Sequence, residues 1–134
     1  MKWDVYMGFL RLYGEENQDA LREATNYTVD LLHLQRFKEV KSLLRKTLPV
    51  ARRVLGDRHE YTMYMKRNYA MALYGDPAAT LNDLREAVTT LEDTERTARR
   101  VFGGAHPVAG EIELSLGNAR TALRARETPS PGSS

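Results

Sequence analysis

PVARRVLGDRH, the stretch from Pro49 to His59, recurs 47 residues later as RTARRVFGGAH, from Arg96 to His106. Six of the eleven positions are identical, namely Ala51/Ala98, Arg52/Arg99, Arg53/Arg100, Val54/Val101, Gly56/Gly103 and His59/His106. A fainter copy lies 42 residues upstream, where RLYGE at 11–15 aligns with RVLGD at 53–57. A period of roughly 40 to 50 residues is typical of repeat proteins, so the sequence predicts an array of similar units.

The composition fits one globular domain of 134 residues, with 42% hydrophobic and 28% charged residues. The formal net charge is +2 and no run of Lys or Arg exceeds two residues, which argues against a basic stripe for nucleic acid. The chain has no cysteine, which excludes disulfides, thiol catalysis and cysteine metal sites and fits a reducing compartment. No long apolar run or secretory leader is present, so we expect a cytoplasmic protein without a membrane span.

Apolar residues recur at steps of three and four along most of the chain, which predicts amphipathic helices. The expected helices cover about 1–13, 17–33, 36–55, 60–74, a segment ending near 102, and 107–126. Gly14 and Gly56 fit the glycine position just after a helix end. Five extra residues (47 minus 42) follow Gly75, and the next helix begins at Asp76, before Pro77, or at Asp83, where Asp83 to Glu86 resembles a capping box.

No segment alternates apolar and polar residues as an exposed strand would, so we expect an all-α fold. The predicted architecture is a short right-handed superhelical solenoid of antiparallel helix pairs, with two complete pairs flanked by two single helices. The predicted segments are a partial unit at 1–14, repeats at 15–56 and 57–103, a last helix at 104–127 and a disordered tail at 128–134. Neither end looks like a polar cap, which fits either a short member of a family with longer arrays or a chain that associates with itself through its ends.

Three features resemble tetratricopeptide repeats of the kinesin-light-chain type. They are the helix ends and turns RRVLGDRH at 52–59 and RRVFGGAHP at 99–107, the first-helix segments NYT at 26–28 and NYA at 68–70, and the second-helix openings FKEV at 37–40 and LREA at 84–87. Pro49 inside a helix, the five-residue insertion, and SLG at 115–117 in place of a third Asn-Leu-Ala depart from the family pattern.

The resemblance implies a non-enzymatic adaptor that binds a peptide segment of a partner protein in a concave groove, without a cofactor. By the same resemblance Asn26 and Asn68 face that groove, where amides can donate to and accept from a peptide backbone, and Arg22, Tyr64 and Arg67 flank them. The positions of the carboxylate clamp known in other members hold Thr25, Val29 and Glu111, so we expect no such clamp.

Competing interpretations remain for these residues. Each of the two asparagines could instead bond a neighbouring helix. His59 and His106 fit stabilisers of the turn or of the next helix better than metal ligands, because no second ligand is close in sequence.

The acidic residues Glu92, Asp93 and Glu95 fit ion pairs with nearby arginines better than catalysis, and we expect no enzymatic activity. A helical-repeat RNA-binding protein is the alternative function. It is motivated by the pI near 9.0 and by the paired arginines 52–53 and 99–100.

Overall fold

The computed structural model of the chain describes residues 2–14 and 17–127, and the regular structure in these ranges is entirely α-helical. The elements, in order, are α1 (Lys2–Tyr13), α2 (Gln18–His33), α3 (Phe37–Val54), α4 (Glu60–Gly75), α5 (Leu81–Phe102) and α6 (Pro107–Glu127). The all-α prediction is therefore confirmed, and α3 continues through Pro49 as expected. The tail predicted at 128–134 lies outside the described residues.

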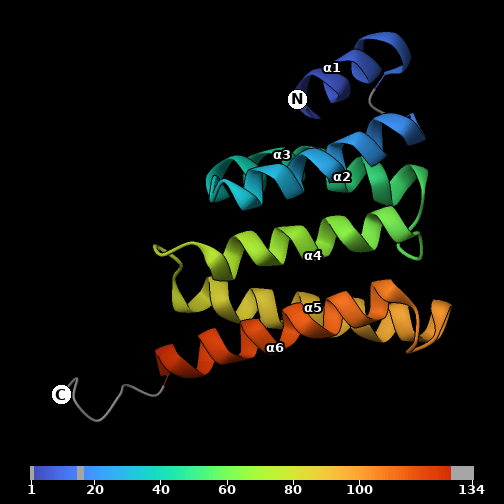
Figure 1. The fold of residues 1–134 in the computed structure, drawn as a ribbon. Coiled ribbons are helices and arrows are strands. Elements are labelled where there is room, and N and C mark those ends of the chain that lie inside the picture. Colours follow the sequence, from blue (N-terminus) through green and yellow to red (C-terminus); the bar gives the residue numbers. More distant parts are fainter. Residues whose placement is uncertain (1, 15–16, 128–134) are drawn as a thin grey trace.

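The helices pack mainly against their neighbours in sequence and lie in successive layers (Figure 1). Helix α1 packs on α2, α2 on α3, α3 on α4, α4 on α5, and α5 on α6. Two further contacts, α2 with α4 and α4 with α6, join helices that are two apart in the chain. The helices α2, α4 and α6 therefore lie side by side, and this row positions the candidate site.

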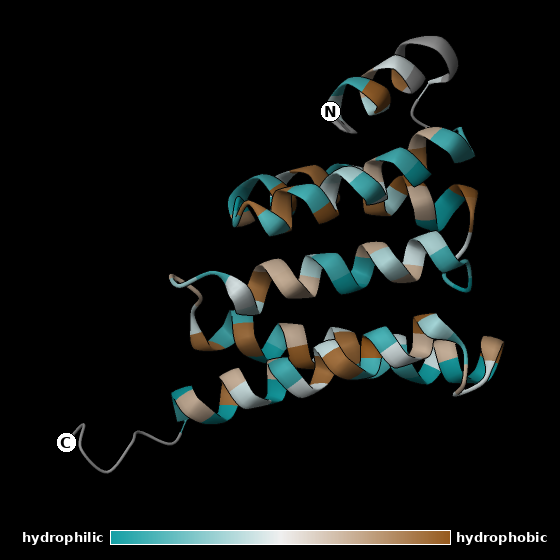
Figure 2. Ribbon diagram, viewed as in Figure 1, coloured by the Kyte–Doolittle hydropathy of each residue, from teal (hydrophilic) through white to brown (hydrophobic). Residues whose placement is uncertain are grey.

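The buried apolar residues form two clusters, and α4 contributes to both of them. The first cluster joins α1, α2 and α3 and includes Met65 and Ala72 of α4. The second joins α5 and α6 and includes Met63, Ala70 and Leu73 of α4. Hydrophobic and hydrophilic residues are interspersed along α2 to α6, as expected for amphipathic helices (Figure 2). Helix α4 is therefore covered on opposite sides by the two halves of the chain.

Three glycines end the helices that precede α2, α4 and α6. Gly14, Gly56 and Gly103 have φ angles of +83°, +90° and +87°, in the left-handed region where glycine has no steric penalty. The amide of Gly56 donates to the carbonyls of Ala51 and Arg52, and that of Gly103 donates to Arg99. Gly56 and Gly103, predicted as equivalent, therefore have the same conformation and the same role.

The residue three positions after each glycine caps the following helix. The amides of Asn17, His59 and His106 each donate to the glycine carbonyl at 3.3 Å. Their side chains then accept a hydrogen bond from the backbone amide two residues later, at 2.8 Å from Asp19, 3.0 Å from Tyr61 and 3.1 Å from Val108. The two histidines stabilise helix starts, as predicted, and the same capping hydrogen bonds recur at equivalent positions of the sequence repeat.

The start of α5 differs from both predicted alternatives. Helix α5 begins at Leu81, and its capping box joins Thr80 and Asp83: the Asp83 amide donates to Thr80 Oγ1 at 3.1 Å and the Thr80 amide to Asp83 Oδ2 at 3.0 Å. Asp83 is therefore the third residue of the helix and not its cap. Asp76 instead stabilises a separate turn by accepting from the Ala78 amide at 2.9 Å.

The outer side of α6 is less apolar than the equivalent side of α2 and α4. Counted from the capping residues, Gly110 takes the position of buried Leu21 and Met63, and Arg120 takes that of Leu31 and Leu73. Arg120 is exposed and pairs with Glu92 of α5 at 3.1 Å. The self-association expected of uncapped ends stays a prediction, and this side of the chain offers it little apolar surface.

The positive φ of Gly103 predicts opposite effects for two glycine substitutions. Gly103→Ala should lower the free energy of unfolding by about 1 to 2 kcal/mol, because a Cβ is strained in the left-handed region. Gly117→Ala is the matched control: Gly117 lies inside α6 with no atom within 4 Å of an added Cβ, so the change should raise that free energy by about 0.5 to 1 kcal/mol. Urea denaturation measures both, and equal effects would contradict the turn.

The shared capping role predicts that His59 can be exchanged for the residue of the first turn. His59→Asn should preserve stability, because Asn17 makes the same hydrogen bond from its side chain. His59→Ala should cost about 1 kcal/mol of unfolding free energy, since the Tyr61 amide loses its acceptor. Thermal denaturation followed by circular dichroism separates the two variants, and an equal loss in both would show that the ring matters through packing instead.

Candidate functional site

Equivalent residues of α2, α4 and α6 align because the three helices begin at equivalent caps. The fifth residue after the cap is Arg22 in α2, Tyr64 in α4 and Glu111 in α6. The eighth is Thr25, Arg67 or Leu114, and the ninth is Asn26, Asn68 or Ser115. The eighth and ninth positions lie three and four residues after the fifth, so all three share one side of each helix.

A cavity of about 310 Å³ lies on this side, between the three helices. Its lining consists of Thr25, Asn26 and Val29 from α2, Tyr64, Arg67 and Asn68 from α4, and Glu111 from α6. Four of the five residues predicted from the sequence for peptide binding therefore meet here, and Asn26 and Asn68 lie on the same side. The fifth, Arg22, is outside the lining, where its guanidinium pairs with Asp19 at 3.0 Å and Glu23 at 3.4 Å.

Asn68 is fully buried, and its side chain links α4 to α2. Its Nδ2 donates to Thr28 Oγ1 at 2.8 Å, and that hydroxyl donates to the Thr25 carbonyl at 2.7 Å. Because Thr28 uses its only proton on Thr25, its oxygen must accept from Asn68, which fixes the orientation of the amide. The alternative interpretation, in which an asparagine bonds a neighbouring helix, is therefore correct for the nitrogen of the Asn68 side chain.

The oxygen of Asn68 has a different environment. Asn68 Oδ1 is buried and has no hydrogen-bond partner among the described residues, and the same is true of Arg67 Nε. One atom is an acceptor and the other a donor, and their side chains line the same cavity. A buried polar atom without a partner costs about 1 to 3 kcal/mol, so such atoms are usually satisfied by a group from outside the chain, either a water molecule or a ligand.

The Arg67 side chain is held by two neighbours. Its Nη1 lies 3.0 Å from Glu111 Oε2, and its guanidinium carbon lies 5.6 Å from the centre of the Tyr64 ring, in cation–π geometry. Burial, with the nearby Glu111 carboxylate as the next cause, raises the pKa of Tyr64 to about 12. The phenol therefore keeps its proton at neutral pH and stays uncharged.

Asn26 supplies the accessible amide of the cavity. It is half-buried, in contrast to Asn68, and no hydrogen bond joins its side chain to another of the described residues. Asn68 finds a partner in Thr28 of α2, whereas Asn26 finds none on α1, the described helix that packs on α2 from the preceding part of the chain. Its amide is free to donate and to accept.

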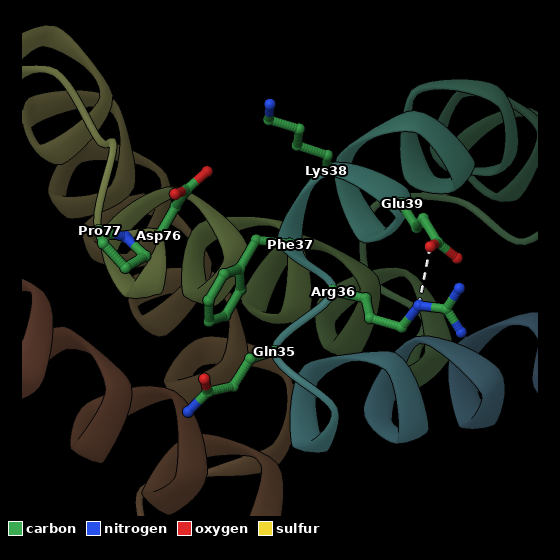
Figure 3. Close-up of a pocket in the computed structure, with 7 residues that line it drawn as sticks. All are labelled: Gln35, Arg36, Phe37, Lys38, Glu39, Asp76 and Pro77. Atoms are coloured by element: carbon green, nitrogen blue, oxygen red, sulfur yellow. Dashed lines mark ion pairs between the residues drawn. The ribbon is translucent and has the colours of Figure 1, made fainter.

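A second hollow, of about 340 Å³, lies where the α2–α3 turn meets the α4–α5 turn (Figure 3). Arg36 and Glu39 pair at 2.8 Å on one side of the hollow, at the start of α3, and Asp76 pairs with Lys41 at 3.3 Å. The Phe37 ring lies 3.0 Å from the place of a Cβ on Gly75, so a larger residue at this position would require the ring to shift by a few tenths of an ångström. We regard this hollow as the joint between the two turns, because its charges are paired or solvated, whereas the cavity holds buried unpartnered atoms.

The remaining candidates from the sequence have structural roles in this chain. Asp93 pairs with Arg96 at 3.1 Å and Glu95 with Arg99 at 2.8 Å, both within α5, as predicted.

Within residues 2–14 and 17–127, no three His, Asp or Glu side chains gather as a metal site would require. None of the helices described is both long enough and apolar enough to cross a membrane.

Sequence reasoning missed the roles of Thr28 and of the cavity-lining residues Thr25, Val29 and Glu111. Thr28 was paired with Ala70 in the repeat and so looked like an ordinary core position, although a hydroxyl in a buried face signals a hydrogen-bond partner. Val29 and Glu111 entered only as reasons against a carboxylate clamp.

Comparison of the chain with protein-family models, curated proteins and solved structures found no match.

The Asn68–Thr28 hydrogen bond should couple the two side chains in a double-mutant cycle. Thr28→Val alone should cost about 1 to 3 kcal/mol of unfolding free energy, because it leaves the Asn68 amide buried without an acceptor. Thr28→Val combined with Asn68→Leu should cost less than the sum of the single changes, by about 1 kcal/mol. Thr121→Val, which removes an exposed hydroxyl from α6, is the matched control and should have little effect. Additive single effects in urea denaturation would disprove the coupling.

Proposed function

We propose that this chain is a protein–protein interaction module that binds a peptide segment of a partner protein in the cavity between α2, α4 and α6. The observation that carries the proposal is the pair of unpartnered buried atoms in one cavity, Arg67 Nε and Asn68 Oδ1. A peptide main chain offers a carbonyl acceptor for the first and an N–H donor for the second. Asn26, beside them, adds a free amide of both kinds.

Binding at these atoms requires a side chain of the cavity lining to move. Both atoms are closed to solvent in the free protein, so a ligand reaches them only after the Arg67 side chain shifts. This side chain is 15% exposed and its outer end is tied to Glu111 by an ion pair that solvent reaches, which is a weak tether. A shift of one arginine rotamer is a common adjustment at binding interfaces.

The proposed architecture follows the resemblance seen in the sequence. The row of α2, α4 and α6, with α3 and α5 packed beside it, fits a short right-handed solenoid of the tetratricopeptide type. In such an array the first helices of the pairs line the binding face, which is where the cavity lies. We propose an adaptor role without catalysis, in the cytoplasm.

The peptide proposal is preferred to RNA binding because of the charges. Arg52 and Arg99, the first members of the two arginine pairs, hold ion pairs with Asp57, and with Glu95 and Glu113. Carboxylates beside these arginines reduce the positive potential available to phosphates.

A random peptide library displayed on phage, selected against the purified chain, tests the proposed function. Selected peptides should bind Asn26→Ala roughly tenfold more weakly than the unchanged chain, the loss expected for one hydrogen-bonding amide. Asn82→Ala is the matched control, because Asn82 is an exposed asparagine of α5 outside the cavity, and it should bind equally well. Circular dichroism verifies that both variants are folded. The proposal fails when no peptide is selected, or when Asn26→Ala leaves the affinity unchanged.

A further inference from the structure

The cavity between α2, α4 and α6 contains one cation and one anion, and they neutralise each other. Arg67 supplies the positive charge and Glu111 the negative one, with Nη1 and Oε2 at 3.0 Å. The other lining residues are uncharged: Thr25, Asn26, Val29, Asn68 and Tyr64, whose phenol keeps its proton. The lining as a whole is therefore polar but has no net charge.

Glu111 controls which groups Arg67 can receive. An incoming carboxylate would need the Arg67 guanidinium, and it would have to displace Glu111 or lie beside it. Two carboxylates at one site repel each other, and breaking an existing ion pair offsets the gain from the new one. An uncharged amide avoids this competition, because it does not repel Glu111 and, once Arg67 has shifted, it can bond Nε while Nη1 pairs with Glu111 again.

A single ligand group can satisfy both unpartnered atoms only if it accepts a hydrogen bond from Arg67 Nε and donates one to Asn68 Oδ1. A carboxylate has acceptors only and leaves Asn68 Oδ1 unsatisfied, and an ammonium has donors only and leaves Arg67 Nε unsatisfied. An amide has a carbonyl oxygen and an N–H, so it is the simplest uncharged group that serves both.

We infer that the cavity selects an uncharged amide of the bound peptide over a carboxylate, and that Glu111 is the residue that sets this preference. The inference rests on the proposed peptide-binding function and specifies the chemistry recognised at its centre. The Glu111 side chain is 49% exposed on α6, so Glu111→Gln removes its charge while keeping its size and its place on the surface.

Small probes test this inference without a peptide. The purified chain is titrated with acetamide, which represents an Asn or Gln side chain, with N-methylacetamide, which represents the main chain, and with sodium acetate. Sodium chloride at equal concentration serves as the reference for acetate. The side-chain NH₂ signals of Asn26 and Asn68 in ¹H–¹⁵N NMR spectra report on the cavity. We expect shifts with at least one amide, the stronger of which identifies its source, and none with acetate beyond the chloride reference.

The variant Glu111→Gln should shift the preference of the cavity from the amide toward the carboxylate. It frees Arg67 and removes the competing carboxylate, so the ratio of acetate affinity to amide affinity should rise roughly tenfold. Glu113→Gln is the matched control, because it removes the same charge from the same helix at an exposed residue that pairs with Arg99 outside the cavity. It should leave the ratio unchanged.

Three results would overturn the inference: acetate shifts the cavity signals of the unchanged chain as strongly as the amides, neither amide shifts them, or Glu111→Gln gains no more acetate binding than Glu113→Gln. Failure of the peptide selection while the amide probes bind as expected would instead reject the proposed function and leave the preference for amides in place.

Discussion

The geometry of the chain depends on one turn that is used three times. A glycine with positive φ ends a helix, and three residues later an asparagine or histidine caps the next one. The glycine carbonyl accepts the amide of the capping residue at the same distance in each turn, so the new helix always leaves at a similar point. Because α2, α4 and α6 start in this way, residues at equal distances from the caps align, and the cavity is a product of that alignment.

Helix α4 is the second requirement of the site. It is the only helix of the described chain that contacts both α2 and α6, so it supplies the centre of the cavity lining. The two ends of the Asn68 amide have different roles in the position of α4. Its nitrogen ties α4 to Thr28 of α2, and as a result its oxygen is left facing the interior without a donor. A structural bond and a candidate binding group thus occupy the two ends of one amide.

Local signals in the sequence were sufficient for most of the fold. Periodic apolar residues predicted the helices, and Gly56 and Gly103 predicted the turns, because both effects act within a few residues. The predicted start of α5 was wrong because Asp83 fits two capping boxes, one with Thr80 before it and one with Glu86 after it. Only the folded turn decides between the two. The burial of Asn68 and the separation of Arg22 from Tyr64 depend on which helix lies opposite. No single sequence records that information: Arg22 finds Asp19 and Glu23 on its own helix, whereas Tyr64 finds Glu111 on another.

The place of α4 in both apolar clusters also governs how the chain loses its structure. In a long repeat array, units at one end can melt while the others persist, since each contacts only its neighbours. Here Met65 and Ala72 belong to one cluster while Met63, Ala70 and Leu73 of the same helix belong to the other. Melting either half strips one side of α4 and leaves the other half with an exposed apolar face. We therefore expect the two halves to be thermodynamically coupled and the chain to unfold as a single cooperative unit.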